Sequence, residues 1–303
     1  SNYFNRFNNI NFPKRKILYT NLIENLRYGE NPHQMGAFYS QNKKNKLDQI
    51  HGKTLSYNNY NDIFAAITIS KSLPKNTGTV IVKHGNPCGV SALKNNLDSY
   101  KSALETDPIS AFGGIVSCNY KITQKIAVML NKIFLEVIVA NGFDKKALKI
   151  LRSKKNLRII DSSKISLNQV WKFNSFDNFT LIQSEDKKIF SKKDFKIVSK
   201  IKPSKSQLDN LMFAFNVCRF TKSNAIVLAS NKSTIGIGSG QPSRLDSCEI
   251  AINKMNKFSK IKNEIVAASD AFFPFVDGIE KLVQSGASAI VQPAGSIRDK
   301  EII

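Results

Sequence analysis

The chain has 303 residues, 42% of them hydrophobic, which is enough for one large or two medium globular domains with substantial cores. Its formal net charge is +22, but the lysines are spread along the whole chain and form no stripe interleaved with aromatic residues, so we expect no specific nucleic-acid binding. No run of about 18 apolar residues occurs, and the N-terminus lacks the apolar segment of a signal peptide, which indicates a cytoplasmic protein without a membrane span.

The four cysteines are widely separated and form no Cys-x-x-Cys pair. This usage favours a reduced intracellular protein with free thiols over a disulfide scaffold. The chain begins with Ser1 and not with an initiator Met, which indicates a processed chain or a fragment of a longer protein.

The first half of the chain is predicted to alternate strands and helices. Residues 1–20 are polar and basic and are typical of a linker or tail, and residues 21–202 form the first block. We expect strands over residues 79–83, 112–117 and 135–140, and helices over residues 96–105 and 123–132. Residues 161–202 are charged and are expected to be an irregular connecting segment.

The second block, residues 203–303, shows the same alternation. We expect helices over residues 207–220, 243–258 and 279–284, and strands over residues 225–229, 234–238 and 287–292, with a hairpin-like turn at 231–233. Two such blocks indicate the α/β class.

Five stretches combine polar residues with glycine or proline at predicted strand ends. They are residues 26–34, 83–89, 107–114, 236–244 and 269–278. Ligands of open α/β sheets bind at such strand ends, so we expect the functional site among these stretches.

The stretch Lys83-His84-Gly85-Asn86-Pro87-Cys88-Gly89 places a histidine where a buried strand runs into a predicted tight loop. The preceding lysine favours the neutral imidazole that a general base needs. A structural histidine that caps the strand is the alternative interpretation, and the local sequence leaves both open. A zinc deaminase site is excluded, because Asn86 stands where that motif needs Glu and Cys88 has no second cysteine three residues later.

The two C-terminal stretches also admit two interpretations each. The glycines that precede Arg244 lack the dinucleotide-binding spacing and are often only structural, yet free N–H groups beside an arginine suit a phosphate or carboxylate. The run Phe272-Phe273-Pro274-Phe275 is more often core than a binding wall, but its flanking Asp270 and Asp277 favour a stacked planar ligand.

Together with a sixth stretch at residues 292–299, these motifs resemble, in order, the formyltransferase part of the AICAR transformylase/IMP cyclohydrolase family. The resemblance implies transfer of a formyl group from 10-formyltetrahydrofolate to AICAR, the ribonucleotide of aminoimidazole carboxamide, in purine biosynthesis. It also implies two similar α-β-α units of cytidine deaminase-like fold without zinc, and a homodimer.

The resemblance further implies roles for individual residues. His84 is similar to the family's general base, and Lys83 to its partner and oxyanion stabiliser. The residues similar to nucleotide contacts are Arg27, Tyr28, Asn59, Phe112, Gly113, Glu136, Asn224, Phe272 and Asp277. The residues similar to folate contacts are Arg244, Leu245, Pro274, Phe275, Ser296 and Ile297.

Two departures from the family pattern affect these expectations. The IMP cyclohydrolase domain that precedes this region in the parent protein is absent from the 303 residues, so ring closure is not expected of them. The family's segment beyond Ile303 is also absent, which leaves open a phosphate contact and a monovalent cation such as K+. The alternative function is a basic RNA-binding or interaction domain without catalysis.

Overall fold

The computed structural model describes residues 12–41, 47–167, 171–260 and 263–303, and the chain divides into two compact units after residue 46. In the first unit, β1 (Asn21–Leu26) and β2 (Gly36–Ser40) form an antiparallel pair. The predicted tail of residues 1–20 is described only from residue 12 onwards, where no helix or strand occurs before Asn21; residues 1–11 lie outside the described part.

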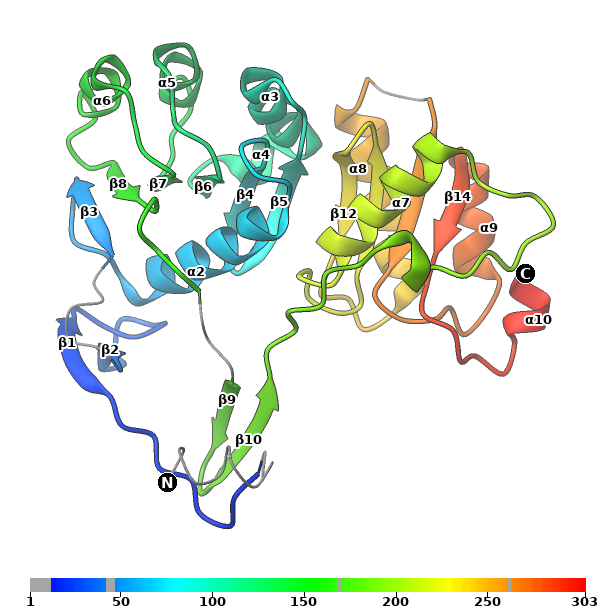
Figure 1. Cartoon of the computed structure of the whole chain (residues 1–303), viewed down its shortest axis with the longest axis horizontal. Helices are drawn as coiled ribbons and strands as arrows, with labels where there is room; N and C mark the ends of the chain where they lie inside the picture. The colour runs from blue at the N-terminus through cyan, green and yellow to red at the C-terminus, as the bar shows by residue number, and fades with distance from the viewer. Residues whose placement is uncertain (1–11, 42–46, 168–170, 261–262) are drawn as a thin grey trace. The chain divides into compact units, whose positions relative to one another are not determined.

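The second unit is built on a sheet of ten strands in the order β14-β13-β11-β12-β5-β4-β6-β7-β8-β3 (Figure 1). The strands are β3 (Asp48–His51), β4 (Thr79–Lys83), β5 (Asn86–Ser91), β6 (Ile115–Cys118), β7 (Val137–Ala140), β8 (Arg158–Asp161), β11 (Ile226–Ser230), β12 (Ser233–Gly238), β13 (Ile265–Ser269) and β14 (Ala287–Val291). The helices are α2 (Tyr57–Ser72), α3 (Asn96–Thr106), α4 (Pro108–Ala111), α5 (Gln124–Asn131), α6 (Lys145–Leu151), α7 (Lys205–Cys218), α8 (Arg244–Phe258), α9 (Asp277–Gln284) and α10 (Asp299–Ile302).

The two halves of this sheet repeat one arrangement of elements. In the first half, α2 precedes the antiparallel hairpin β4–β5, α3 follows it, and β6 and β7 run parallel to each other with α5 between them. In the second half, α7, β11–β12, α8, β13, α9 and β14 follow in the same order and with the same strand directions. The halves join where β5 pairs antiparallel with β12. The predicted α/β class is confirmed, whereas the boundary at residue 202 stays a proposal.

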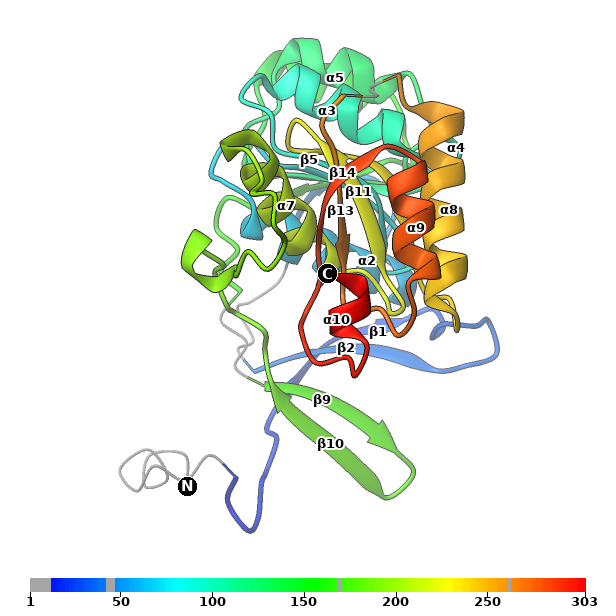
Figure 2. The same ribbon diagram turned by 90° about the vertical axis from the view of Figure 1, so that its right-hand side faces the viewer.

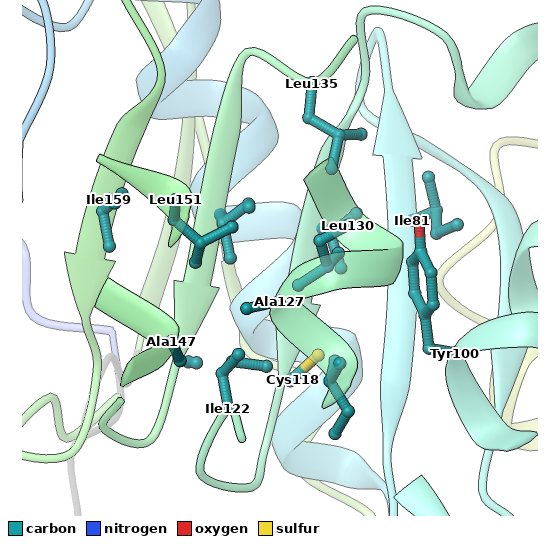
Figure 3. Close-up of a cluster of buried hydrophobic side chains, with 14 of the residues drawn as sticks. Ile81, Tyr100, Cys118, Ile122, Ala127, Leu130, Leu135, Ala147, Leu151 and Ile159 are labelled. Carbon is teal, nitrogen blue, oxygen red and sulfur yellow. The ribbon is translucent and has the colours of Figure 1, made fainter. Parts of the chain in front are cut away.

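Helices cover both faces of the sheet. Helices α2 and α7 pack on one face, and α3, α5, α6, α8 and α9 form a connected layer on the other (Figure 2). The strands between the two layers are therefore apolar on both sides, as in β4, where Val80, Ile81 and Val82 are all fully buried. Figure 3 shows the core of the first half, where strand residues such as Ile81 and Ile159 meet Leu130 and Leu151 from the helices.

The stretch after Lys83 was predicted to be a loop to residue 89, and this is wrong. Only His84 and Gly85 form the turn, with φ angles of 52° and 73°, and β5 begins at Asn86. Positive φ at both central residues is typical of the type I′ turn, whose twist suits a two-residue hairpin. Pro87 misled the prediction: it lies inside β5, opposite Val82 and next to a bulge, where a strand tolerates its missing N–H.

The segment 161–202 is also more regular than predicted. It contains an antiparallel hairpin of β9 (Trp171–Phe176) and β10 (Phe179–Ser184), and a short 3₁₀ helix, Lys192–Asp194. Most side chains of both strands are exposed, so the sequence carries no buried-strand pattern there. No helix in the described parts of the chain is long and apolar enough to cross a membrane.

Candidate active site

One edge of the sheet collects predicted site residues from both halves. Because β5 and β12 are antiparallel, the start of β5 lies at the same edge as the end of β12. The backbone N–H of Lys222, in the loop before β11, donates to Asn86 Oδ1 at 3.0 Å, and Gly240 N–H donates to the Lys222 carbonyl at 2.8 Å. These bonds connect the His84 turn to the loop that leads into α8.

The His84 turn is held by a residue that the sequence analysis did not single out. Asp62, on α2, accepts the Gly85 N–H at 2.6 Å and the His84 N–H at 3.2 Å. Burial is the main cause that raises the pKa of Asp62, while the two backbone N–H groups and the nearby His84 partly oppose the rise and Glu136 adds to it. The signal that could have revealed α2 is the capping box Ser56–Asn59, which opens the helix one turn earlier.

Lys83 points toward the loop before β6. Its Nζ donates to the Phe112 carbonyl at 2.8 Å, and it lies about 4.0 Å from the place that a Cβ on Gly113 would occupy. Phe112 is 59% exposed and its ring packs at a tilt against Phe134, with the centroids 5.3 Å apart. An ammonium group and an exposed aromatic face therefore stand together at this edge.

A polar bridge connects α2 to the start of β7. Asn59 Nδ2 donates to Glu136 Oε2 at 2.8 Å, and Arg158 Nη1 lies 3.7 Å from the same oxygen. Asn59 is 4% exposed and also completes the N-terminal cap of α2 with Ser56. The predicted residues Asn59 and Glu136 thus come together, although 77 positions separate them.

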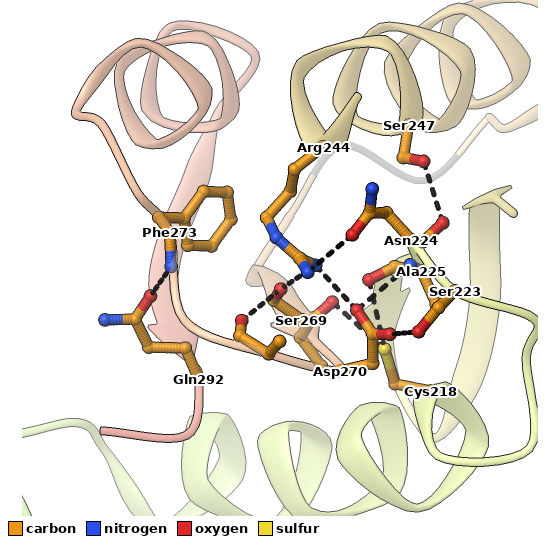
Figure 4. Close-up of polar contacts among 12 residues, drawn as sticks. Cys218, Ser223, Asn224, Ala225, Arg244, Ser247, Ser269, Asp270, Phe273 and Gln292 are labelled. Atoms are coloured by element: carbon orange, nitrogen blue, oxygen red, sulfur yellow. Dashed lines mark hydrogen bonds and ion pairs between the residues drawn. The ribbon is translucent and has the colours of Figure 1, made fainter. Parts of the chain in front are cut away.

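In the second half, Arg244 is the centre of a buried polar network (Figure 4). Its guanidinium donates to Asp270 Oδ1 at 2.6 Å, to Ser269 Oγ at 2.7 Å and to Asn224 Oδ1 at 2.7 Å. The Arg244 side chain is 10% exposed and the Asp270 side chain 12%. Arg244 was predicted to bind the folate, and here its guanidinium is bonded to groups of the protein itself.

Asp270 holds this network from the end of β13. Burial alone would raise its pKa, but hydrogen bonds from Ser223, Arg244 and the Ala225 N–H outweigh burial and leave the pKa below its usual value. The carboxylate therefore stays charged and ties the start of α8 to the segment before β11.

Two of the glycines before Arg244 have a structural role, whereas Gly240 lies in the loop before α8 with a φ of 70°, and the anion-binding interpretation stays a prediction. Gly236 and Gly238 lie inside β12, under α8, and not in a loop. A Cβ on Gly238 would stand 1.9 Å from the Ser247 carbonyl oxygen, so only glycine allows the helix to pack at this distance.

The phenylalanine run divides between core and surface. Phe273 is 1% exposed, packs under Arg244 and donates its N–H to Gln292 Oε1 at 2.8 Å. Phe272 and Phe275 are 40% and 51% exposed, and Arg298 lies over the Phe275 ring, 4.9 Å from its centroid. The run therefore contributes one ring to the core and leaves two aromatic faces exposed, while ligand stacking on them stays a prediction.

The remaining predicted residues of this half lie around the same edge. Pro274 is exposed, Asp277 opens α9 and is exposed, and Leu245 is half-buried in the first turn of α8. Ser296 and Ile297 follow β14; the Ser296 hydroxyl accepts the Arg298 N–H at 3.1 Å, and Ile297 is fully exposed.

Arg27 and Tyr28 belong to the other compact unit, residues 1–46, and are described within that unit alone. The Arg27 guanidinium lies over the Tyr28 ring, 5.7 Å from its centroid. The next turn is closed by the Gly29 N–H, which donates to the Gln34 carbonyl at 2.7 Å.

Among the described residues, the cysteines and acidic side chains form no metal centre. All four cysteines are buried with free thiols, and burial raises the pKa of Cys88 to about 12. Within the described residues, no three or more His, Cys, Asp or Glu side chains are grouped so that they could hold a metal ion. The described part of the edge thus offers a histidine, cations, carboxylates and exposed aromatic rings as its chemical groups.

Comparison with known proteins identifies close relatives. A family model described as the AICARFT/IMPCHase bienzyme matches residues 1–254. The bifunctional purine biosynthesis protein PurH of Acetivibrio thermocellus is 43% identical over 300 residues, which cover 96% of this chain and 58% of that protein. The PurH proteins of Leptospira biflexa and Aquifex aeolicus are 43% and 40% identical over 306 and 296 residues, or 100% and 96% of this chain and 59% and 58% of theirs. The chain therefore spans little more than half the length of these curated relatives.

Proposed function

The chain belongs to the AICARFT/IMPCHase bienzyme family, and from this premise we propose that it transfers the formyl group of 10-formyltetrahydrofolate to AICAR, yielding formyl-AICAR and tetrahydrofolate. We assign to these residues only the formyl-transfer part of the bienzyme's chemistry. The observation that carries the proposal is the adjacency of His84 and Lys83 beside exposed aromatic rings at one sheet edge.

The reaction needs a base and a cation at the same place. The 5-amino group of AICAR is a weak nucleophile, because its lone pair is drawn into the ring and the carboxamide, so positioning supplies much of the acceleration. As this nitrogen attacks the formyl carbon, the carbonyl electrons move onto the formyl oxygen and the amine proton must leave. We propose that His84 takes this proton, since its side chain is exposed at the turn.

Lys83 is the proposed stabiliser of the oxyanion. One of its three N–H donors is directed at the Phe112 carbonyl, which holds the ammonium group at the edge and leaves two donors for the formyl oxygen. When the carbonyl re-forms, the bond from the formyl carbon to N10 of the folate breaks, and the proton from His84 passes to N10. The step then balances without a further reactant.

The substrate contacts follow from the exposed groups. We propose that Phe112 and Phe272 flank the flat base of AICAR, and that Phe275 and Pro274 flank the pterin ring of the folate. Asn59, Gly113, Glu136, Asn224 and Asp277 are proposed as further nucleotide contacts, with Arg27 and Tyr28 of the first unit, and Leu245, Ser296 and Ile297 as folate contacts. Arg244 is better suited to hold the site in shape than to touch the folate, because three of the five N–H donors of its guanidinium already bond to Ser269, Asp270 and Asn224. K+ stays a prediction, to be tested by assaying the protein in potassium and tetramethylammonium salts.

The test is a formyl-transfer assay with both substrates, followed by the same assay on His84→Ala. We expect turnover to fall by about 10²–10⁴-fold while AICAR binding changes little, because a general base acts on the transition state. Lys83→Ala should be comparably harmful, and the double variant should lose less than the product of the two effects, since both groups act on one transition state. His33, an exposed histidine of the first unit, is the control: His33→Ala should keep near wild-type turnover. A folded His84→Ala protein with normal turnover would remove this mechanism.

A further inference from the structure

The two halves of the sheet hold their hairpin turns in the same way. In the first half, Asp62 on α2 accepts the N–H groups of His84 and Gly85. In the second half, Asn210 on α7 accepts the Lys232 N–H at 2.8 Å through Oδ1. The second turn, Asn231-Lys232, also has two positive φ angles, 46° and 53°. A helix side chain that accepts backbone N–H bonds from a strained two-residue turn is therefore a repeated feature of the fold.

The two helix side chains that hold the turns differ in charge. Asn210 is 3% exposed and holds its turn as a neutral amide, so the fold does not need a carboxylate for this purpose. A partly buried carboxylate is costly, and burial raises the pKa of Asp62. The chain nevertheless carries Asp and not Asn in the half whose turn contains His84. The negative charge thus calls for an explanation other than holding the turn.

The charged groups around Asp62 supply that explanation. His84 is of opposite sign to Asp62 once it is protonated, and Glu136 is a second carboxylate nearby whose charge is partly offset by Arg158. Lys83 precedes His84 and has its ammonium group directed to the Phe112 carbonyl. When His84 takes a proton it becomes a cation next to Lys83, and an adjacent anion is needed to make that change favourable.

We propose, on the basis of the proposed formyl transfer, that Asp62 is a positioning residue for His84. Its two oxygens fix the turn, and its negative charge stabilises the imidazolium that forms as the AICAR amine loses its proton. Asp62 itself keeps no proton in this step; the proton resides on His84 and then passes to N10 of the folate. This is the way in which a carboxylate orients and supports a catalytic histidine in general.

Three variants separate the effect of the negative charge from the effect of the hydrogen bonds that hold the turn. Asp62→Asn keeps one acceptor oxygen for the Gly85 N–H, as Asn210 does in the other half, and removes the charge. Asp62→Ala removes both. Asn210→Ala removes the hydrogen-bond acceptor of the second turn. This turn lies at the other end of β5 and β12 from the His84 turn. For each protein we would measure the turnover number for formyl transfer and its pH profile, the dissociation constant of AICAR, and the midpoint of thermal unfolding.

We expect Asp62→Asn to reduce turnover by about tenfold or more, with the AICAR dissociation constant and the unfolding midpoint near those of the wild type. The acid limb of its kcat/KM profile should move to lower pH. Without the nearby anion the protonated imidazolium is less favourable, so the neutral base persists to lower pH. Asp62→Ala should lower both turnover and the unfolding midpoint. Asn210→Ala should lower the unfolding midpoint and leave turnover and the pH profile unchanged.

The outcomes distinguish this inference from the proposed function. Asp62→Asn with wild-type turnover and an unmoved pH profile would show that the charge serves nothing in catalysis and would overturn the positioning role alone. A wild-type protein that transfers no formyl group to AICAR would overturn the proposed function and the positioning role with it. If Asp62→Asn loses activity only to the extent that its unfolding midpoint falls, Asp62 has a purely structural role, and the inference is overturned as well.

Discussion

Two aspartates at one edge of the sheet have opposite pKa shifts for identifiable reasons. Asp62 receives only backbone N–H groups, which do not compensate for its burial, so its pKa is raised. Asp270 is also penalised by burial, but it gains a hydroxyl, a guanidinium and a backbone N–H, so its pKa is lowered. The number and charge of the donors therefore decide whether a buried carboxylate stabilises this protein.

The lowered pKa of Asp270 predicts how stability depends on pH. A depressed carboxyl pKa contributes stability that is present above the ordinary aspartate pKa, near 4, and is lost as the pH falls through the lower folded-state value. We expect Asp270→Asn to cost about 3 kcal/mol at neutral pH, because the Arg244 charge is left buried without a partner. As the pH falls below about 5, the unfolding midpoint of Asp270→Asn should change less than that of the wild type. Thermal unfolding followed by circular dichroism measures both midpoints.

The control for this experiment is the exposed pair of Asp98 and Lys101, whose closest atoms are 3.9 Å apart. Asp98→Asn should leave the unfolding midpoint unchanged, because exposed pairs contribute little. If Asp270→Asn lost as much stability on acidification as the wild type, the stabilising role of its charge would be wrong.

At the scale of the elements, the hairpin β4–β5 shows how close packing restricts a sequence. Gly89, in β5, lies under α3, and a Cβ there would stand 1.8 Å from the Ala103 carbonyl oxygen. Gly236 in β12 has the same relation to Ala251 in α8, at 2.1 Å. Each half thus places a helix backbone directly on the second strand of its hairpin. The glycine is required by this contact and not by a ligand.

Two glycine substitutions in this one hairpin should therefore have different costs. Gly89→Ala should lower the free energy of unfolding by about 3 kcal/mol or more, because a backbone carbonyl has to move. Gly85→Ala meets nothing within 4 Å and should cost about 1 kcal/mol, the strain of a left-handed φ in a residue with a Cβ. Urea unfolding of both variants measures the difference, and equal costs would contradict the close packing of α3 on β5.

At the scale of the whole molecule, charge and exposed apolar groups favour opposite outcomes for self-association. The net charge of +22 on each chain opposes the approach of two copies at low salt. The hairpin β9–β10 exposes Phe176, Phe179 and Leu181 by 57%, 75% and 64%, and such apolar surface favours contact with a partner. The dispersion of nucleotide and folate motifs over the chain, with the family resemblance, leads us to propose a homodimer.

The homodimer is tested by sedimentation at micromolar concentration. We expect the dimer to tighten as the salt concentration rises from about 50 mM to about 300 mM, because screening weakens the repulsion between like-charged chains. An RNA-binding protein would show the opposite salt dependence toward its ligand, since it would release counterions on binding. A protein that stays monomeric throughout, with full formyl-transfer activity, would exclude a site that depends on the dimer.

The sequence by itself determined the alternation of strands and helices, the family, and the positions of the helices and strands that it predicted, to within about three residues. Thr79–Lys83 could be predicted because a strand covered on both faces needs a continuous apolar run, and α8 because its buried residues recur at helical spacing. The motifs also placed Lys83 and His84 at a strand end. These features depend on neighbours in the chain, so local patterns are enough to recognise them.

The tertiary structure alone decided which side chains meet. Asp62 reaches the His84 turn from 22 positions away, and Arg244 reaches Asp270 from 26 positions away. Such contacts depend on how each helix is seated on the sheet and on the strand register, and no local pattern in the chain encodes either. The same holds for Pro87 and Gly238, each of which is a turn signal in isolation. Pairing within the sheet makes Pro87 part of β5, and the close packing of α8 on β12 requires the glycine at 238.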